Sequence, residues 1–318
     1  MTYGELLTGF KGQRVVVVGD VMIDEYLYGD ATRISPEAPV MVVRHGRTER
    51  LPGGAANVAR NLQALGASVH LIGVVGDDPG AEMLEACLRE QGLHSVTLVK
   101  ESGRATTRKV RVLADATHQT LRIDFEDDHP VGAATASEIV DAVRRQTDGA
   151  QVLLLSDYVK GALTEEVVQG CIEAVTVPVV ANAKPESIER YRGIELVSVN
   201  RAEATKALGR AKPIERSEAV AAARELRNRY EVGGILLTLG HEGMVAVGRE
   251  VVEVPARRVE VYDTAGAGDT VIATVALGIG SAGFRREVFE LAAETAACVV
   301  RHVGVATPSP RDLAEISR

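Results

Sequence analysis

Short aliphatic runs alternate with segments of helical pattern between residues 152 and 239, and this alternation constrains the fold more than any other feature of the sequence. The predicted strands are 152–155, 178–181, 195–199 and 234–239, and the predicted helices are 165–174 and 217–230. Strands that alternate with helices build a mostly parallel sheet that is covered by helices on both faces. We therefore predict an α/β fold of three layers.

The first half of the chain continues this pattern with two interruptions. Residues 14–20 form a β-branched run that ends in Gly19-Asp20, which is typical of a strand buried on both faces. The segments of about 25–50 and 106–125 interrupt the α/β pattern with β-like strands. Because no low-complexity linker divides the chain, we predict one domain, residues 1–318, that carries both segments as a small lid. Hydrophobic residues are 46% of the chain and aromatic residues only 3%, so we expect an aliphatic core.

Charge and composition argue against several classes of partner. Lys and Arg number 36 and Asp and Glu 44, so the net charge is −8, and without a long basic run we expect no nucleic-acid or acidic-membrane partner. No stretch is apolar for long enough to span a bilayer, and the three cysteines lack metal-ligand spacing. The GxGxxG signature is missing after the first strand, and GxxxxGK[ST] is missing from the sequence. We expect a cytoplasmic protein.

The stretch from Asp263 to Thr270, with the sequence DTAGAGDT, points to a ligand site. The apolar runs 251–254 and 259–262 precede it, and the alanine-rich apolar run 271–277 follows it. This order predicts a strand, a glycine-rich turn and the start of a buried helix. The site is therefore expected at a helix N-terminus.

Gly266, Ala267 and Gly268 carry almost no side chain, so their N–H groups can approach a ligand closely. The first N–H groups of a helix lack partners within it and carry partial positive charge, which predicts a site for an anion, most naturally phosphate. Asp269 beside it has two interpretations. It is a helix cap, or it is the base that takes a proton from a substrate hydroxyl while the turn stabilises the transferring phosphoryl group.

Polar residues also accompany the first strand and the first long helix. Asp20 and Asp24 lie where a strand meets a loop, which is the usual ligand crevice of an open α/β sheet, although a turn or cap role is equally open. Gly53 and Gly54 precede a predicted helix and permit close backbone approach. Asn57 can both donate and accept, which suits a polyol.

Residues 106–125 predict a β-hairpin with one apolar and one charged face. On it, Val110, Val112, Leu121, Ile123 and Phe125 alternate with Lys109, Arg111, Arg122 and Asp124, and residues 115–118 lie between as a turn. The charged face has two interpretations. It is merely solvated, or its three cations, with few acids beside them, bind a substrate phosphate.

Three motifs in order give the chain a resemblance to a known family. They are Gly53-Gly54-Ala55-Ala56-Asn57-Val58-Ala59, the NxxE-like Asn200 to Glu203, and Asp263 to Asp269. Together they extend over nearly the whole chain, which resembles the ribokinase-like sugar kinases, also called the PfkB family. The resemblance implies a ribokinase-like α/β/α fold with a β lid. It also implies an ATP- and Mg²⁺-dependent kinase of a sugar or sugar phosphate.

Within that family, four further stretches resemble the kinase half of the ADP-heptose synthesis enzymes. They are residues 18–24, 33–40, 156–161 and 189–193. Those kinases phosphorylate D-glycero-β-D-manno-heptose 7-phosphate at O1. Because the sequence ends at Arg318, we expect it to lack the nucleotidyltransferase domain that follows the kinase in bifunctional members.

The resemblance also implies a role for each candidate residue. Asp269 would be the catalytic base, with an anion hole made by Gly266, Ala267 and Gly268. The sugar would be held by Asp20, Asp24, Gly53, Gly54 and Asn57, and its phosphate by Lys109, Arg111 and Arg122. The nucleotide would contact Asn200, Thr238, Gly240 and Gly243, with Glu203 organising Mg²⁺ through water and the helix 294–301 closing the adenine side. For Thr238 and the two glycines, a strand end and turn is the alternative.

Three positions depart from the pattern of the heptose kinases. Asn182 stands where they carry Asp, Ala265 where Thr is usual, and Ala293 where Asn is common. These changes leave two alternatives to a heptose 7-phosphate kinase: a kinase of another sugar, sugar phosphate or nucleoside, and a non-catalytic sugar- or nucleotide-binding sensor. The family resemblance further implies a homodimer through the lid, and it leaves open a monovalent cation beside the glycine turn.

Overall fold

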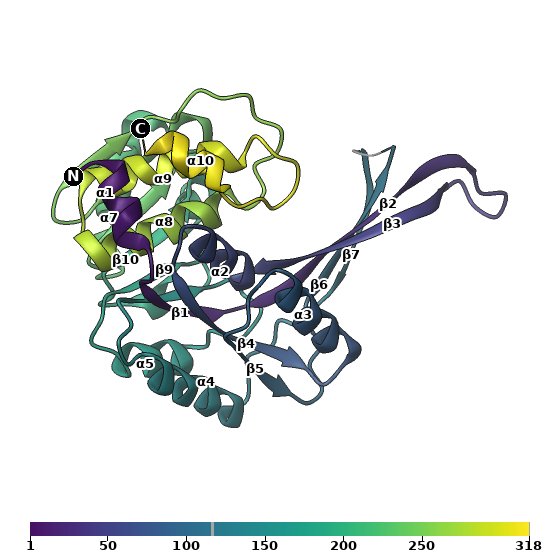
Figure 1. Cartoon of the computed structure of the whole chain (residues 1–318), viewed down its shortest axis with the longest axis horizontal. Helices are drawn as coiled ribbons and strands as arrows, with labels where there is room; N and C mark the ends of the chain where they lie inside the picture. Colours follow the sequence, from purple (N-terminus) through teal and green to yellow (C-terminus); the bar gives the residue numbers. More distant parts are fainter. Residues whose placement is uncertain (116–117, 318) are drawn as a thin grey trace.

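The computed structural model describes residues 1–115 and 118–317, and it contains two sheets (Figure 1). The larger sheet has nine strands in the order β13-β12-β11-β10-β9-β8-β1-β4-β5, and the smaller has four in the order β3-β2-β6-β7. The nine strands are β1 (Arg14–Gly19), β4 (Ser68–Gly76), β5 (Val96–Glu101), β8 (Val152–Ser156), β9 (Val179–Asn182), β10 (Leu196–Asn200), β11 (Ile235–Thr238), β12 (Met244–Val247) and β13 (Val251–Val254). Neighbouring strands from β5 to β11 are parallel, whereas β12 and β13 are antiparallel.

Helices cover both faces of the large sheet, as the alternating sequence pattern predicts. They are α1 (Tyr3–Phe10), α2 (Ala55–Ala64), α3 (Pro79–Glu90), α4 (Ala133–Gln146), α5 (Glu165–Glu173), α6 (Arg201–Ala207), α7 (Ala219–Arg229), α8 (Ala267–Ala282), α9 (Arg286–Val299) and α10 (Pro310–Ile316). Short 3₁₀ turns occupy Ile188–Tyr191, Arg216–Glu218 and Gly240–Glu242.

Alternate residues of each central strand serve two separate cores. On β8, Leu153 and Leu155 pack with α4 and α5, whereas Val152 and Leu154 pack with α1, α2 and α8. Because a strand turns successive side chains to opposite faces, this division requires a run that is apolar throughout. The predicted three-layer α/β fold is confirmed.

The four-stranded sheet extends away from the body (Figure 1). Its strands are β2 (Val21–Ile34), β3 (Met41–Gly54), β6 (Arg108–Ala114) and β7 (His118–Phe125). They comprise the two segments expected to form the lid, and β6 and β7 pair in the predicted antiparallel manner, with Arg111 opposite Arg122. Of the predicted turn between them, Ala116 and Thr117 lie outside the described residues.

One predicted strand is wrong. The apolar alternation of residues 259–262 lies in an irregular segment between β13 and α8, where Val261 and Tyr262 are more than half exposed. The sheet ends instead at Val254, directly before Pro255, which has no N–H to donate to a ladder. The segment is tied to the end of α9, since the N–H of Tyr262 donates to the carbonyl of Val300.

Within residues 1–115 and 118–317, no helix combines the length and the apolar character that crossing a bilayer requires.

Candidate active site

The carboxyl ends of five parallel strands bring polar residues to one edge of the large sheet. Strand register aligns Gly19 with Ser156, Ser156 and Ser198 with Asn182, and Asn200 with Thr238. Open α/β sheets bind ligands at this edge. The candidate residues at the ends of β1, β10 and β11 therefore share one side of the molecule.

The glycine turn precedes α8 as expected. Gly266 is the N-cap, and its φ of 78° is in the left-handed region that glycine adopts at little cost. A Cβ on Gly266 would lie 3.0 Å from Asn57 Nδ2, whereas a Cβ on Gly268 would meet nothing within 4 Å. The first turn of α8 is thus closed against α2 on one side and open at Gly268, which is the geometry that an incoming anion requires.

Both carboxylate oxygens of Asp269 have a donor. Asn57 Nδ2 donates to Oδ2 at 2.7 Å, and the Tyr158 hydroxyl donates to Oδ1 at 2.5 Å. Burial raises the pKa of Asp269, and the hydrogen bonds from Tyr158 and Asn57 and the charge of Lys184 act in the opposite direction. A carboxylate that is fixed in orientation and keeps free lone pairs can still accept a substrate proton.

Asp24 and the lid meet next to this group. The carboxylate of Asp24 accepts from Arg111 Nη1 at 2.5 Å, and its Oδ2 would lie 2.2 Å from a Cβ on Gly53. Glycine is therefore required at residue 53 by the close approach of Asp24. Gly54 has φ +59° and would bring a Cβ within 2.3 Å of the Asp20 carbonyl. The two glycines serve the junction between lid and body.

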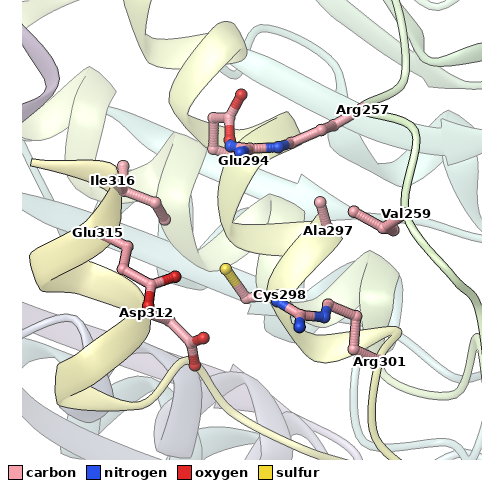
Figure 2. A pocket seen from close by; sticks show the side chains of 9 residues that line it. All are labelled: Arg257, Val259, Glu294, Ala297, Cys298, Arg301, Asp312, Glu315 and Ile316. Carbon is pink, nitrogen blue, oxygen red and sulfur yellow. The ribbon is translucent and has the colours of Figure 1, made fainter. Parts of the chain in front are cut away.

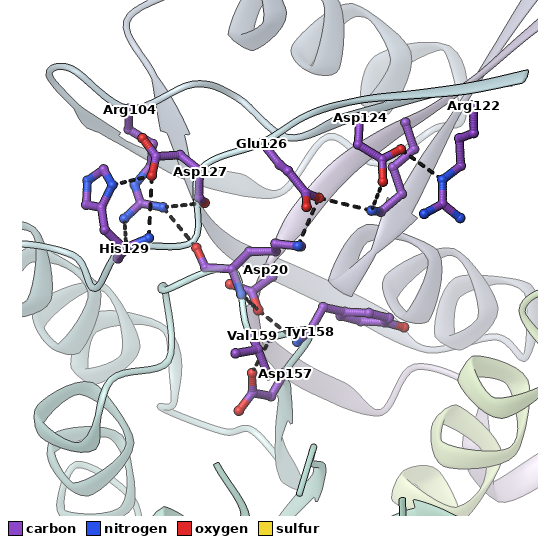
Figure 3. Close-up of polar contacts among 12 residues, drawn as sticks. Asp20, Arg104, Arg122, Asp124, Glu126, Asp127, His129, Asp157, Tyr158 and Val159 are labelled. Atoms are coloured by element: carbon purple, nitrogen blue, oxygen red, sulfur yellow. Dashed lines mark hydrogen bonds and ion pairs between the residues drawn. The ribbon is translucent and has the colours of Figure 1, made fainter. Parts of the chain in front are cut away.

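Asp20 lies at the same edge, but backbone N–H groups of the chain already donate to its carboxylate. Its carboxylate accepts from the backbone N–H groups of Tyr158, Lys160 and Ala162, at 2.7, 3.1 and 3.1 Å, as Figure 3 shows in part. Burial and the neighbouring Asp157 raise the pKa of Asp20 to about 6, against these three donors. Direct contact between Asp20 and a sugar stays a prediction, whereas its contact with this loop is present in the structure.

The expectation that few acids accompany the hairpin cations is wrong. Lys109 Nζ lies 3.4 Å from Asp124 and 3.1 Å from Glu126, and Arg122 Nε lies 3.0 Å from Asp124 (Figure 3). With Asp24 on Arg111, each of the three cations has a carboxylate partner. Strand alternation brings cations and acids to the same face of β7, so the charges come in pairs.

The NxxE segment forms the start of α6. Asn200 Oδ1 accepts from the Glu203 N–H, and Glu203 Oε2 accepts from the Asn200 N–H, which is a capping box. The other oxygen of Glu203 lies 2.5 Å from Lys184 Nζ. Glu203 is therefore both a cap and the partner of a cation at the strand edge.

The candidate nucleotide residues Thr238, Gly240 and Gly243 follow one another at the end of β11 and the turn after it. Gly243 has φ +95°, and a Cβ there would lie 2.1 Å from the Val254 carbonyl. A structural requirement accounts for this glycine. Gly240 would meet nothing within 4 Å and is exposed, so its turn is open to a ligand.

The helix expected to close the adenine side lies beside a small cavity of about 90 Å³ (Figure 2). Its lining comprises Arg257, Val259, Glu294, Ala297, Cys298, Arg301, Asp312, Glu315 and Ile316. Arg257 forms an ion pair with Glu294, which joins the segment after β13 to α9. Ala293 packs against the core beneath, and the adenine role of α9 stays a prediction.

Comparison with known proteins identifies the family. Residues 13–312 match the model of the pfkB family carbohydrate kinases. The chain belongs to this family. A D-beta-D-heptose 7-phosphate kinase of Bordetella bronchiseptica is 46% identical over 270 residues, which are 83% of each chain. A bifunctional protein HldE of Hyphomonas neptunium is 38% identical over 314 residues, and our chain covers 64% of its length.

The fold comparison agrees with the family. Phosphofructokinase-2 from Escherichia coli, crystallised in complex with potassium, superposes with a TM-score of 0.81 over 96% of this chain and 98% of its own, at 20% sequence identity. This likeness confirms the ribokinase-like fold. As a pfkB-family kinase, the protein is expected to use ATP and, typically for such kinases, Mg²⁺.

Two described residues at the strand edge, Glu203 and Asn182, could contribute to holding a metal ion. No group of three or more His, Cys, Asp or Glu side chains gathers as a metal site in the described part of the chain. Glu203 is at the strand edge, and the buried Asn182 Oδ1 lacks a hydrogen-bond partner. Mg²⁺ commonly retains several waters and is held by one or two protein groups together with substrate phosphates, and the oxygens of Glu203 and Asn182 suit that kind of binding.

Sequence reasoning missed three polar residues of the kinase's site. Tyr158 reaches Asp269, Lys184 lies 5.3 Å from the Tyr158 ring centre, and Arg60 Nη1 donates to Asn57 Oδ1 at 3.2 Å. Tyr158 and Lys184 lie two positions after the ends of β8 and β9, so the strand-end rule that selected Asp20 could have found them. Arg60 lies one turn beyond Asn57 on α2, and helical spacing was its signal.

Proposed function

We propose that this kinase transfers the γ-phosphoryl group of ATP to O1 of D-glycero-β-D-manno-heptose 7-phosphate. The observation that carries the proposal is Asp269, held by Asn57 and Tyr158 beside the open glycine turn. The heptose 7-phosphate kinase of Bordetella bronchiseptica, 46% identical over 83% of each chain, supports the choice of acceptor. We also infer that residues 1–318 form one kinase domain with the four-stranded sheet as its lid.

In this mechanism Asp269 takes the proton of the O1 hydroxyl as O1 attacks the γ-phosphorus. The bond from that phosphorus to the β,γ-bridging oxygen breaks, and ADP leaves. Gly266, Ala267 and Gly268 present the first turn of α8 to the charge on the transferring group. Asn57 and Tyr158 keep the base in one orientation, so that its free lone pairs face the hydroxyl.

The sugar phosphate would be bound by the lid cations Lys109, Arg111 and Arg122. Each is already paired with a carboxylate, so binding exchanges one partner for another and requires no new cation. Of the three cations, Arg111 is expected to matter most, because its partner Asp24 lies at the junction of lid and body. Asp24, Gly53 and Gly54 would then bound the sugar pocket.

Mg²⁺, when bound with ATP, would neutralise phosphate charge. Glu203 would hold it through water, and Asn182 would offer its unpartnered Oδ1. In the structure Lys184 is paired with Glu203. If Glu203 turned to the waters of the metal, Lys184 would be released and could bind a phosphate oxygen. Asn200, Thr238, Gly240 and Gly243 would contact the nucleotide. A monovalent cation beside the glycine turn is part of the proposal, because the structurally similar phosphofructokinase-2 was crystallised with potassium.

A kinase with a different sugar acceptor is the second candidate. Asn182, Ala265 and Ala293 motivate it, since they lie in or near the expected nucleotide and phosphate contacts. A non-catalytic sensor is not favoured, because Asp269 and the glycine turn are intact and the similar protein of Bordetella bronchiseptica is named as a heptose 7-phosphate kinase.

ATP consumption with Mg²⁺ should be measured against a panel of sugars and sugar phosphates that includes the heptose 7-phosphate. We expect turnover on the heptose 7-phosphate and little on fructose 6-phosphate or ribose. Turnover on another sugar alone would show that the protein is a kinase with an acceptor other than the heptose 7-phosphate. Bound nucleotide without turnover on any member would contradict both enzymatic candidates.

We further propose that the lid pairs two copies of the chain. Leu121, Ile123 and Phe125 on β7 are 53, 42 and 45% exposed, and Ile34 on β2 and Met41 on β3 of the same sheet are exposed as well. Apolar residues gathered on one sheet indicate a contact surface. A second lid of the same kind would cover them.

A further inference from the structure

Tyr158 lies on a loop whose backbone is fixed from two sides. The loop connects β8 to α5, and the Asp20 carboxylate accepts its N–H groups at residues 158, 160 and 162. The intervening N–H of Val159 donates to Asp157 Oδ1 at 2.8 Å. Two buried carboxylates therefore bind successive N–H groups of one short segment (Figure 3).

Strain in this segment indicates that its conformation is imposed. Val159 has φ +56°, which a β-branched residue rarely adopts. Gly161 has φ +87°, and a Cβ there would lie 2.0 Å from the His129 carbonyl. Residues in such conformations persist only where the surroundings hold them, and they cluster at functional sites.

A third support comes from a buried arginine. Arg104 is 7% exposed, pairs with Glu101 at 2.6 Å, and donates to the Lys160 carbonyl at 2.9 Å. It also donates to the carbonyls of Asp127 and His129, and so joins two loops (Figure 3). Tyr191, fully buried, donates to the second oxygen of Asp157 at 2.7 Å. The clamped loop brings the hydroxyl of Tyr158 to Asp269, and it also brings Lys160 to Glu126 beside Lys109.

We propose that Tyr158 is the positioning residue of the Asp269 base, and that Asp20 and Asp157 act as its clamp. This inference rests on the proposed function, in which Asp269 takes the substrate proton. The Tyr158 hydroxyl donates to one oxygen of Asp269, which fixes the carboxylate plane and favours its ionised form. In this proposal the carboxylate of Asp20 holds the loop, and its direct contact with a sugar stays a separate prediction.

The electrostatic surroundings of Asp269 agree with this role. Burial raises the pKa of Asp269, and Asp24 on β2 raises it further, whereas Tyr158, Asn57 and Lys184 lower it. Arg60 on α2 does not contact Asp269 itself, but it donates to Asn57, which in turn donates to Asp269. The pKa of Tyr158 is raised well above 10 by burial and by Asp269, so the phenol stays protonated and remains a donor. Without the hydrogen bond from Tyr158, the pKa of Asp269 would be higher, so Asp269 would stay protonated up to a higher pH.

The test is Tyr158→Phe, which removes only the hydroxyl and keeps the ring beside Lys184. A hydrogen bond to a charged group is worth about 1.5–3 kcal/mol, so we expect kcat to fall roughly 10- to 100-fold. The acid limb of the pH profile of kcat/KM should move to higher pH, because it reports the free-enzyme base. The matched control is Tyr230→Phe, which removes a partly buried hydroxyl that donates to the Ala207 carbonyl away from the site, and it should leave the acid limb in place.

Asp20→Asn tests the contact between Tyr158 and Asp269 in a second way, by weakening the clamp on the Tyr158 loop. If Asp20 clamps the loop, this variant lowers kcat and moves the acid limb in the same direction. If Asp20 instead binds the sugar, KM rises and the acid limb stays. An unchanged kcat and acid limb in Tyr158→Phe, with turnover lost in Asp269→Asn, would overturn the positioning role and leave the base intact. Full turnover in Asp269→Asn would instead overturn the proposed function itself.

Discussion

The large sheet and the lid sheet contain the same kinds of apolar and polar residue, but they place these residues differently. In the central strands of the large sheet, β-branched and aliphatic residues on both faces are covered by helices, and Ser156, Asn182 and Asn200 lie where β8, β9 and β10 end. In the lid, apolar and charged residues occupy opposite faces of β6 and β7, and several apolar residues remain exposed. We infer that the strand ends of the body carry the chemistry, whereas the lid offers exposed surface to a ligand or a second copy of the chain.

The largest effect is expected at the body's edge. Asp269→Asn retains the shape of the side chain and removes the base, so kcat should fall by about two to four orders of magnitude. Nucleotide binding and the thermal unfolding midpoint should stay close to those of the unmodified protein. They can be measured by titration calorimetry and circular dichroism. Near-normal turnover would show that another group takes the proton.

The exposed apolar face of the lid is expected to affect self-association rather than catalysis. Leu121→Asp places a charge on the exposed apolar face of β7, so a dimer formed through this face should dissociate. Sedimentation velocity at several protein concentrations measures this directly. Arg122→Ala, on the opposite face of the same strand, is the matched control and should leave self-association unchanged. A dimer that survives Leu121→Asp would place the contact elsewhere.

The two lid arginines should differ from each other. Arg111 is largely covered and holds the buried Asp24, so Arg111→Ala should raise KM for the phosphorylated sugar about tenfold or more. It should also lower the free energy of unfolding by about 1–3 kcal/mol, because Asp24 loses its partner. Arg122 is half exposed, so Arg122→Ala should change KM a few-fold and stability by about 0.5 kcal/mol at most. Equal effects would mean that burial does not distinguish the two.

The smallest effect concerns the metal. Asn182→Asp would place a carboxylate where Asn182 Oδ1 has no hydrogen-bond partner, so the Mg²⁺ concentration for half-maximal activity should fall a few-fold. Asn182→Ala, which adds no charge, is the control and should not lower it. An unchanged Mg²⁺ requirement in Asn182→Asp would exclude this position from the metal's surroundings.

The sequence allowed the body to be predicted better than the lid, for a physical reason. Strands buried on both faces, such as 152–155, leave a continuous apolar run that is visible without tertiary information. The strand expected at 259–262 failed because its alternation, though regular, has no sheet neighbour to pair with. Local pattern does not report the partner.

The candidate site shows the same limit. The glycine turn and Asp269 were predicted because a helix start and its small residues are local features. Tyr158 was missed because its contact with Asp269 joins residues 111 positions apart. The acids beside Lys109 and Arg122 were underestimated because their pairing depends on hairpin register. Sequence therefore indicated which chemistry to expect, and only the fold showed how the groups are oriented.

Asp20 is the single residue between β1 and β2, and so between the body and the lid. Its carbonyl accepts from the Ala55 N–H at the start of α2, and its carboxylate holds the Tyr158 loop. A swing of the lid about this point would turn the same residue that orients the base. We infer that the lid angle and the orientation of Asp269 are linked in this way, so that an open lid would leave the proposed base out of alignment when no sugar is bound.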